Sequence, residues 1–458
     1  MRALGSLASL LILLPAFGPA AHARACCGAP DLAARVARAT EAGQGPAPAP
    51  GTLPLFDGRS LAGWWGAETE NPRGYQALAP EELAAKKARS RTDIEQHWRV
   101  ENGELVNDGN GLYLTTQQDY ADFELWLEYK TVALADSGVY LRGCPQIQIW
   151  DTTEAGGKWN LGADKGSGGL WNNSPGAAGK DPLTKADKPF GEWNALRVRM
   201  IGERVSVWLN DALVVDHARL ENYFDRKLAL PRAGPIQLQT HGGEIRWRKL
   251  WLREIPAAEA NALLAAQGAT RFERVFDGAS FDGWNGALDG WEIEGGALRC
   301  KRGSGGTLYT RREYADFAAR LEFLLPPGGN NGLAIRYPGE GDAAYSGMCE
   351  LQVLDSEDAR YAKLDPRQFH GSAYGMVAAQ RGYLRPPGEW NFQEILVRGS
   401  TLQVEVNGTR ILDADLATVK ETMYPLEKFA GRLRASGHFG FAGHDDPVAF
   451  RNVLLRSL

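Results

Sequence analysis

The amino-acid sequence contains an internal repeat, which limits the folds open to this chain more than any other feature. Blocks of the N-terminal half recur in the same order in the C-terminal half, and each copy has about 200 residues. Three of these pairs are PLFDGRSLAGWWG (54–66) with RVFDGASFDGWNG (274–286), DSGVYLRG (136–143) with NNGLAIRY (330–337), and PFGEWNALRVRM (189–200) with PPGEWNFQEILV (386–397). Chance does not produce such an order, so we predict two similar domains in tandem.

Most of the repeated blocks alternate apolar and polar residues, which is typical of a β-strand with one buried face. FELWLEYK (123–130) is one example, and Asn210-Asp211 and Asn407-Gly408 are two-residue hairpin signals. Turn residues recur at intervals of about 8–12 residues. We therefore predict an all-β protein with two β-sandwich (jelly-roll) domains and few short helices. Helical periodicity is limited to residues 80–89 and 256–267.

The N-terminus has the pattern of a signal peptide. Arg2 precedes a short apolar run, and Ala21-His22-Ala23 fits a small-x-small cleavage site. The apolar run is shorter than the roughly 18 residues of a membrane span, and no other stretch is long enough. We therefore predict a periplasmic or secreted protein without a transmembrane segment. The expected segments are a signal peptide (1–23), a flexible leader (24–51), a first sandwich (52–255), a linker (256–271) and a second sandwich (272–458).

Charge and cysteine usage exclude some classes of protein. The chain has 458 residues and a net charge of −5, whereas a nucleic-acid-binding surface is basic. The cysteines are odd in number and lack both disulfide and metal spacing; they are Cys26, Cys27, Cys144, Cys300 and Cys349. A disulfide between Cys144 and either Cys26 or Cys27 is one possibility. The alternative is that Cys144, Cys300 and Cys349 are small buried residues.

The stretch CPQIQIWD (144–151) carries an unusual polar face. In a strand its isoleucines point to one side, toward the core, while Gln146, Gln148 and Trp150 point to the other. The second copy, MCELQVLD (348–355), places Glu350 and Gln352 at the glutamine positions. A face with amides, a carboxylate and an indole suggests a binding surface for sugar hydroxyls.

The preceding strands add candidates to this face. If they pair with the two stretches above, Tyr140, Arg142 and Arg336 join it, and an arginine fork binds oxygen atoms in a fixed geometry. The alternative is a solvated cross-strand pair without function. Because the constellation occurs twice, we favour a site. Asp151 and Asp355 end their strands, where a functional carboxylate and a turn cap are equally good readings.

Histidines supply candidate acids and bases. His370 lies in a Gly-rich loop before Tyr374, and a histidine of ordinary pKa exchanges protons near neutral pH. The alternative is a histidine that caps a turn. His241 and His444 occupy matching positions before the last strand of each copy. Three loop residues of the first copy are further candidate contacts, namely Lys158, Asn172 and Asn173.

Several catalytic classes lack their motifs. The sequence has no G-x-S-x-G elbow, no H-E-x-x-H and no phosphate-binding P-loop. A retaining glycosidase needs two carboxylates at close range, but the polar strand offers only Glu350 in one copy and none in the other. Ordinary double-carboxylate hydrolysis is therefore disfavoured.

Taken together, the blocks LFDG-x-S-L-x-GW, SGVYLRG, Q-x-Q-I-x-D, GEWN and HGGEIRWR resemble the 3-keto-disaccharide hydrolase domain. The resemblance covers both copies, residues 52–255 and 272–458. It implies concanavalin-like sandwiches and the cleavage of glycosides that are oxidised to a ketone at sugar carbon 3. Cleavage would proceed by elimination across carbons 1 and 2, or it would amount to net hydrolysis. The substrate would be an oligosaccharide or glycoside.

The resemblance also assigns roles to residues. The second copy matches the family pattern at Arg336, Glu350, Gln352, Asp355, His370, Tyr374 and His444. His370 or Glu350 would be the base, since the 3-ketone acidifies the carbon-2 proton, and Arg336 would polarise the keto oxygen. The first copy lacks counterparts of Glu350 and His370; it would bind sugar or use Asp151 and His241. A divalent metal at the acid/His/Gln cluster stays open, as does a lectin-like protein without catalysis.

Overall fold

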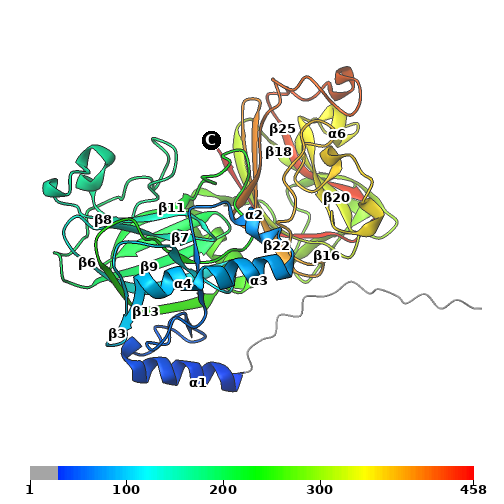
Figure 1. The fold of residues 1–458 in the computed structure, drawn as a ribbon. Helices are drawn as coiled ribbons and strands as arrows, with labels where there is room; N and C mark the ends of the chain where they lie inside the picture. Colours follow the sequence, from blue (N-terminus) through cyan, green and yellow to red (C-terminus); the bar gives the residue numbers. More distant parts are fainter. Residues whose placement is uncertain (1–28) are drawn as a thin grey trace, which may run out of the picture.

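Residues 29–458 are described in a computed structural model, in which two β-sandwiches lie side by side (Figure 1). Each sandwich packs an eight-stranded antiparallel sheet against a five-stranded one, as predicted for two concanavalin-like jelly rolls. The predicted signal peptide (1–23) and Cys26 and Cys27 lie outside the described residues. No helix within residues 29–458 is long and apolar enough to cross a membrane.

The first sandwich has the strand orders β11-β10-β9-β6-β13-β4-β3, with β1 beside β13, and β2-β5-β12-β7-β8. The strands of its eight-stranded sheet are β1 (Leu53–Pro54), β3 (Trp98–Glu101), β4 (Glu104–Asn107), β6 (Phe123–Thr131), β9 (Asn194–Ile201), β10 (Arg204–Leu209), β11 (Ala212–Arg219) and β13 (Ile245–Glu254). Those of its five-stranded sheet are β2 (Trp64–Ala67), β5 (Tyr113–Thr116), β7 (Asp136–Leu141), β8 (Cys144–Trp150) and β12 (Gln237–Leu238).

The second sandwich repeats both orders, as β24-β23-β22-β19-β26-β17-β16, with β14 beside β26, and as β15-β18-β25-β20-β21. Its eight-stranded sheet contains β14 (Glu273–Arg274), β16 (Trp291–Glu294), β17 (Ala297–Cys300), β19 (Phe317–Leu324), β22 (Trp390–Arg398), β23 (Thr401–Val406), β24 (Thr409–Asp415) and β26 (Ala449–Ser457). Its five-stranded sheet contains β15 (Trp284–Gly286), β18 (Gly305–Tyr314), β20 (Asn330–Tyr337), β21 (Cys349–Leu354) and β25 (Gly437–His444).

Helices are short and lie between or beside the sheets. They are α1 (Ala29–Ala39), α2 (Pro72–Gln76), α3 (Pro80–Arg89), α4 (Arg91–His97), α5 (Ala257–Ala266) and α6 (Ala343–Ser346). A turn at Thr40–Gln44 follows α1, and single helical turns lie at Glu154–Gly156, Trp159–Leu161, Ala163–Lys165, Ala269–Arg271, Leu288–Gly290, Ala359–Tyr361, Pro366–Gln368 and Leu426–Phe429. The helices predicted at 80–89 and 256–267 are confirmed as α3 and α5.

The alternation of the polar strands is as predicted. Ile147 and Ile149 of β8 are buried in the first core, and Leu351 and Val353 of β21 are buried in the second. Full burial of one such side chain stabilises the fold by about 1.5–3 kcal/mol. Antiparallel pairing of β7 with β8 and of β20 with β21 is also confirmed. The polar residues of β8 and β21 therefore lie on the face turned away from the eight-stranded sheet. The three described cysteines are buried and unpaired, namely Cys144, Cys300 and Cys349.

The segment before the first sandwich differs from the flexible leader predicted for residues 24–51. Residues 29–39 form α1, and Gln44 is buried against the first sandwich. The Gln44 amide donates to the carbonyl of Gly103 (2.6 Å) and accepts from the backbone N–H of Lys249 (2.7 Å). Its backbone carbonyl accepts from the indole of Trp251 (3.2 Å). These three hydrogen bonds fix a segment whose Ala, Gly and Pro content alone suggested flexibility.

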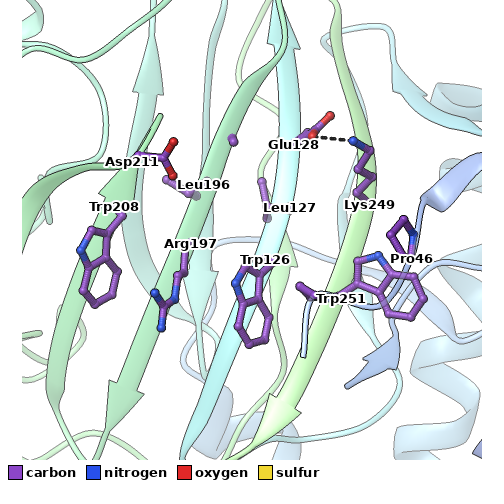
Figure 2. Close-up of a pocket in the computed structure, with 12 residues that line it drawn as sticks. Pro46, Trp126, Leu127, Glu128, Leu196, Arg197, Trp208, Asp211, Lys249 and Trp251 are labelled. Atoms are coloured by element: carbon purple, nitrogen blue, oxygen red, sulfur yellow. Dashed lines mark hydrogen bonds and ion pairs between the residues drawn. The ribbon is translucent and has the colours of Figure 1, made fainter. Parts of the chain in front are cut away.

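The outer face of the first eight-stranded sheet carries a row of large side chains. Four of them are direct cross-strand neighbours: Trp208 on β10, Arg197 on β9, Trp126 on β6 and Trp251 on β13 (Figure 2). The Arg197 guanidinium lies between two indoles, 4.8 Å from the ring centroid of Trp208 and 5.9 Å from that of Trp126.

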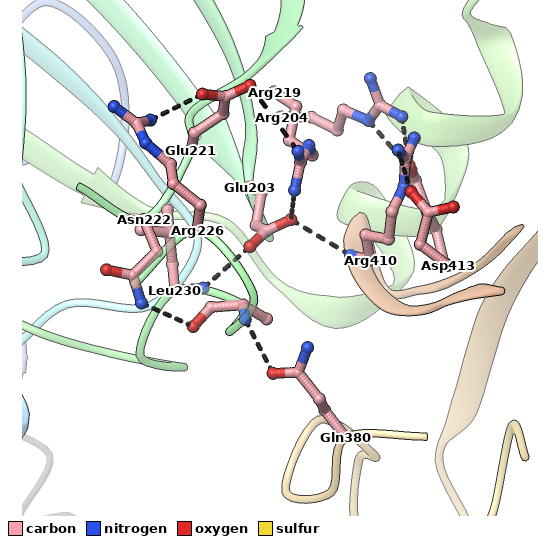
Figure 3. Close-up of polar contacts among 12 residues, drawn as sticks. Glu203, Arg204, Arg219, Glu221, Asn222, Arg226, Leu230, Gln380, Arg410 and Asp413 are labelled. Atoms are coloured by element: carbon pink, nitrogen blue, oxygen red, sulfur yellow. Dashed lines mark hydrogen bonds and ion pairs between the residues drawn. The ribbon is translucent and has the colours of Figure 1, made fainter. Parts of the chain in front are cut away.

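Polar contacts join the two sandwiches, as Figure 3 shows around Glu203. Glu203 lies in the β9–β10 turn and is fully buried. Its carboxylate accepts from the backbone N–H groups of Leu230 (2.8 Å) and Arg410 (3.2 Å). Burial raises the pKa of Glu203. Beside it, Arg204 of β10 donates from Nε to Glu405 of β23 (3.0 Å), so the two eight-stranded sheets meet at their hairpins.

Helix α5 fills the space between the hairpins. Leu264 of α5 packs with Ile201, Ile255 and Phe392 in a small apolar cluster between the sandwiches. Asn261 of the same helix donates to the carboxylate of Glu322 in the second sandwich (2.7 Å). The linker is therefore part of the interface between the domains.

Candidate active site

A cavity of about 280 Å³ opens on the polar face of the five-stranded sheet in the second sandwich. It lies over β20, β21 and the end of β25, between α6 and the loops that follow β21. Its walls are mostly polar and aromatic side chains: Asn330, Asp342, Ala344, Tyr345, Glu350, Gln352, Leu354, Tyr361, Leu364, Gln368, Tyr374 and His444. Four of the residues singled out in the sequence therefore meet here, namely Glu350, Gln352, Tyr374 and His444.

Glu350 and His444 form a hydrogen-bonded pair at the cavity floor. Glu350 Oε1 lies 2.9 Å from His444 Nε2, although β20 separates their strands in the sheet. The Glu350 side chain crosses over Gly332 of β20, where an added Cβ would lie 2.1 Å from Oε1. Glycine at this position therefore makes room for the pair.

The two partners differ in exposure. The side chain of Glu350 is 5% exposed, whereas that of His444 is 43% exposed and borders the cavity. The hydrogen bond to Glu350 raises the pKa of His444 above its ordinary value, although burial acts in the opposite direction. Among the described residues no other group hydrogen-bonds to the His444 ring. Nδ1 of His444 is thus available to a ligand, and Glu350 fixes the ring.

Tyr374 provides a hydroxyl donor on the same wall. Its backbone N–H donates to the carbonyl of Glu350 (3.0 Å), which fixes the loop beside β21. Its phenol oxygen accepts a bond from Gln368 Nε2 (3.1 Å), and the same hydroxyl interacts with the side chain of Tyr424. Burial raises the pKa of Tyr374 to about 12 and keeps the phenol protonated.

The remaining polar side chains order the cavity wall. Gln352 Nε2 donates to Asn330 Oδ1 (2.6 Å) across β20 and β21. The Tyr361 hydroxyl donates to the carbonyl of Gly328 (2.9 Å). Asp342 is a second carboxylate on the wall, and one of its oxygens caps α6 by accepting from Ala344 N–H (2.8 Å).

Arg336 does not face the cavity, contrary to the role predicted for it. Its φ of 46° lies in the left-handed region and interrupts the strand alternation. Its buried guanidinium donates to the carbonyls of Ala315 (2.7 Å), Gly399 (2.7 Å) and Arg434 (2.8 Å) and to Asp316 Oδ1 (2.9 Å). Arg336 therefore has a structural role, and the prediction that it polarises a keto oxygen is wrong.

Arg142 has the same structural role in the first sandwich. Its φ is 55°, and its guanidinium donates to the carbonyls of Ala121 (2.6 Å) and Pro231 (3.2 Å) and to Asp122 Oδ1 (3.0 Å). The predicted substrate contact through Arg142 is therefore also wrong. The recurrence of arginine in both copies reflects the fold.

His370 lies below the cavity, inside the second core. Its ring is 4% exposed and stacks on Phe323 of β19, with 4.9 Å between the ring centroids. Burial lowers the pKa of His370 to about 3, so the ring is neutral at physiological pH. The predicted role of His370 as catalytic base is therefore wrong, because the loop turns this side chain inward.

Asp355 and Asp151 serve as turn caps, one of the two readings of the sequence. Asp355 Oδ2 accepts from Gly328 N–H (2.8 Å). Asp151 accepts from the backbone N–H groups of Leu134 and Thr153 (2.8 Å each). Both carboxylates close the turn before the neighbouring strand and neither lines the cavity, contrary to the catalytic role predicted for Asp355 and the substrate contact predicted for Asp151.

The first sandwich has a different set of groups at the corresponding positions. Gln146 replaces Glu350, so His241, the counterpart of His444, lacks that partner. His241 Nε2 lies 3.8 Å from Asp136 Oδ2, beyond hydrogen-bond distance. Asp136 instead pairs with Lys158 and accepts from Gln148 Nε2 (2.7 Å).

Other parts of the first sandwich cover this face. The Tyr140 hydroxyl bonds to Thr69 in the helical insert (2.9 Å). Trp150 is buried, donates from its indole to the carbonyl of Gly166 (3.1 Å) and packs edge-on against Trp171. Predicted sugar contacts by Tyr140 and Trp150 would require these layers to move. Asn173 is also structural, since its amide donates to the carbonyl of Arg219 (2.8 Å).

A metal has no evident ligand set in the described part of the chain. Within residues 29–458 no three side chains of His, Cys, Asp or Glu converge in a way that could hold an ion. The acid/His/Gln cluster contains one close acid–histidine pair, Glu350 and His444.

Sequence reasoning missed several residues that line the cavity. Tyr345 lies in α6 and Tyr361 in the helical turn Ala359–Tyr361; both belong to connections that differ between the copies, and this difference was the available signal. Asp342 lies in the longer loop of the second copy. Asn330 occupies the first position of β20 and gave no signal, because its partner Gln352 lies 22 residues away.

Comparison with known proteins places both copies in one family. A family model described as the 3-keto-alpha-glucoside-1,2-lyase-like domain matches residues 51–253 and again residues 271–456. A 3-keto-disaccharide hydrolase from Bacteroides thetaiotaomicron is 27% identical over 267 residues, which cover 50% of this chain and 91% of that protein.

Solved structures also match part of this chain. A candidate glycosyl hydrolase from Parabacteroides distasonis is 24% identical with a TM-score of 0.36, and the match covers 41% of this chain and 99% of that chain. A carbohydrate-binding module from Bacillus subtilis is 14% identical with a TM-score of 0.27, covering 38% of this chain and 96% of that chain.

Proposed function

Because the chain belongs to the family of 3-keto-α-glucoside-1,2-lyase-like domains, we propose that it cleaves 3-keto-glycosides by elimination across carbons 1 and 2. The observation that supports this most is the hydrogen bond between Glu350 and His444 (2.9 Å) in a cavity of the second sandwich. The name of the Bacteroides relative, a 3-keto-disaccharide hydrolase, points to the same class of substrate.

The base in this proposal is His444, with Glu350 as the group that positions it. A 3-ketone makes the carbon-2 proton acidic, so one base near neutral pH is enough to remove it. His444 Nδ1 takes this proton, and the electron pair moves onto the ketone to form an enolate. The protonated ring is then stabilised by the Glu350 carboxylate, as in a carboxylate-oriented histidine base.

Tyr374 is the proposed donor to the keto oxygen. Its phenol accepts from Gln368 and interacts with Tyr424, and its proton turns to the enolate oxygen when the substrate binds. Collapse of the enolate forms the carbon 1–carbon 2 double bond and breaks the bond from carbon 1 to the glycosidic oxygen. The departing alkoxide takes the proton that His444 accepted and leaves as the free alcohol. Addition of water to the double bond would complete a net hydrolysis.

A second candidate function rests on Asp342. This carboxylate shares the cavity with Glu350, and two carboxylates on one cavity are what ordinary glycoside hydrolysis needs. Two observations count against it: Asp342 caps α6, and Glu350 is bonded to His444. An unoxidised glycoside distinguishes the two functions, because it lacks the acidic carbon-2 proton.

The test uses the purified full chain with a 3-keto-disaccharide and with its unoxidised parent. We expect release of the leaving sugar from the keto form alone. Glu350→Gln should lower this release about 100-fold or more while the fold is retained. Cleavage of the parent would favour hydrolysis by two carboxylates. Binding of the keto form without cleavage would favour a lectin-like protein.

A further inference from the structure

A second hollow, of about 560 Å³, lies on the outer face of the first eight-stranded sheet. Trp126, Trp208 and Arg197 form its lower wall, and Glu128, Asp211 and Lys249 lie above them (Figure 2). Pro46 and Pro48 of the N-terminal segment close one end. The hollow belongs to the sandwich that lacks the Glu350–His444 pair, and no catalytic group proposed above lies in it.

The hollow exists because one residue of the outer face is small. Ala195 lies two residues before Arg197 on β9, on the same face of the sheet, and is exposed. The half-buried indoles of Trp126 and Trp208 stand beside it, each within 6 Å of the Arg197 guanidinium. Arg197 is also held by Glu124 (2.7 Å). The aromatic rings are therefore fixed in place before any ligand arrives.

The rim has charges of both signs. Lys249 Nζ lies 2.8 Å from Glu128 Oε1, and Asp211 is exposed in the hairpin turn between β10 and β11. With Arg197, the hollow thus has two carboxylates and two cations. This balance suits a neutral ligand with many hydroxyl groups better than a charged one.

Matching positions of the two sandwiches carry different residues on this face. In the second sandwich the positions of Ala195, Trp126 and Trp208 are held by Phe392, Arg320 and Glu405, at the same strand register.

Those counterparts belong to the interface between the sandwiches. Phe392 occupies the space that corresponds to the hollow and packs on Leu264 of α5. Arg320 donates to the carbonyl of Gln267 just after α5. Glu405 binds Arg204. One copy therefore covers this face within the protein, and the other leaves it open with two indoles.

We propose that the hollow is a binding site for a chain of neutral hexopyranose units, separate from the active site. Aromatic rings bind the apolar face of a sugar ring, and carboxylate, ammonium and guanidinium groups bind its hydroxyls. The volume lies within the range of about 300–1,000 Å³ that is usual for ligand sites. The first sandwich would then hold a glycan while the second acts on its own substrate. This proposal does not depend on the proposed reaction.

The experiment is affinity electrophoresis of the full chain in native gels cast with amylose, dextran or barley β-glucan. Ala195→Phe is the main variant, because it copies the second sandwich and fills the hollow without removing a buried group. Trp126→Ala is the second variant. Trp159→Ala is the matched control, since Trp159 is a 45% exposed indole of the same sandwich outside the hollow.

We expect at least one of the three glucans to retard the wild type and the control. Ala195→Phe and Trp126→Ala should each raise the dissociation constant about tenfold or more. Thermal unfolding checks that both variants fold, and Ala195→Phe should keep its activity on a 3-keto-disaccharide. Equal retardation of the variants and the wild type, or no retardation in any gel, would overturn the proposal. A change of oligomeric state in Ala195→Phe without a change in glycan affinity would identify the face as a contact between copies and would also overturn it.

Discussion

Glu350 of β21 reaches His444 of β25 across the intervening strand β20, and the two side chains meet at 2.9 Å. Direct neighbours in a sheet need no such path, because their side chains are already close. Here the long carboxylate arm lies over Gly332, which has no side chain to block it. The pair therefore depends on three strands at once, and each of the three contributes one residue.

Gly332→Ala should disrupt the pair without removing either partner. The new Cβ would lie 2.1 Å from Glu350 Oε1, so the carboxylate has to move away from His444. We expect the rate on a 3-keto-disaccharide to fall about 100-fold, because an unoriented histidine is a poor general base. The matched control is Gly138→Ala, at the same position of the first sandwich. A loss of activity in both variants alike would indicate a general effect on folding.

The rate should rise with pH as His444 loses its proton. The bond to Glu350 raises the pKa of His444, so the acid limb of kcat/KM should lie above the ordinary histidine value of about 6.5. Glu350→Gln removes the charge that raises this pKa, and its residual activity should begin to rise at lower pH. The measurement is kcat/KM against pH for both proteins. An acid limb at the same pH in both would show that His444 does not titrate in this limb.

Arg336→Lys should lower stability more than activity per folded molecule. Lysine cannot replace the planar guanidinium, which serves three backbone carbonyls and Asp316, so buried acceptors would be left unpaired. We expect a loss of about 3 kcal/mol in the free energy of unfolding. Urea unfolding gives this value, and kcat is then measured on the folded fraction. A variant of wild-type stability without activity would restore the catalytic role that the geometry removes.

Arg204→Ala should weaken the contact between the sandwiches. Although burial opposes ionisation of Glu405, its ion pairs with Arg204 and Arg410 hold the pKa of Glu405 below its ordinary value. Without Arg204 the buried carboxylate keeps one partner, at a cost of about 2–4 kcal/mol. We expect one unfolding transition in the wild type and two in the variant. Calorimetry measures this; a single unchanged transition would mean that α5 and the contacts of Glu203 couple the domains without Arg204.

The strands were predictable because their pattern is local. Alternation around Ile147 and Ile149 identifies the buried face, and the repeat shows that the same fold occurs twice. Asn210 and Asn407 adopt positive φ in their hairpin turns, as the turn residues indicated. Each of these features depends on a few consecutive residues, so the sequence alone was sufficient.

The site was predicted only in part, because it depends on contacts between distant residues. Glu350, Gln352 and His444 were singled out by polarity and repetition, and Tyr374 by the family resemblance; all four line the cavity. Arg336 was misplaced because strand alternation assumes regular backbone, and its left-handed φ turns the side chain to another part of the fold.

Loops gave the remaining errors. A histidine in a Gly-rich loop is free to point either way, and His370 points into the core against Phe323. The predicted flexible leader contains a buried glutamine, Gln44, whose partners lie 59 and 205 residues away in the sequence. Composition cannot reveal such partners, since each contact exists only in the folded chain.

The role of Glu350 and His444 in removing the carbon-2 proton is tested most directly by following that proton. The full chain and its Glu350→Gln and His444→Ala variants are incubated in D₂O with a 3-keto-disaccharide, and NMR records deuterium at carbon 2 and release of the leaving sugar. If His444 is the base and Glu350 positions it, the wild type removes the carbon-2 proton and cleaves the glycoside, and both variants lose the two reactions together. Cleavage by the wild type with the original proton retained at carbon 2 would contradict it, as would full exchange by either variant.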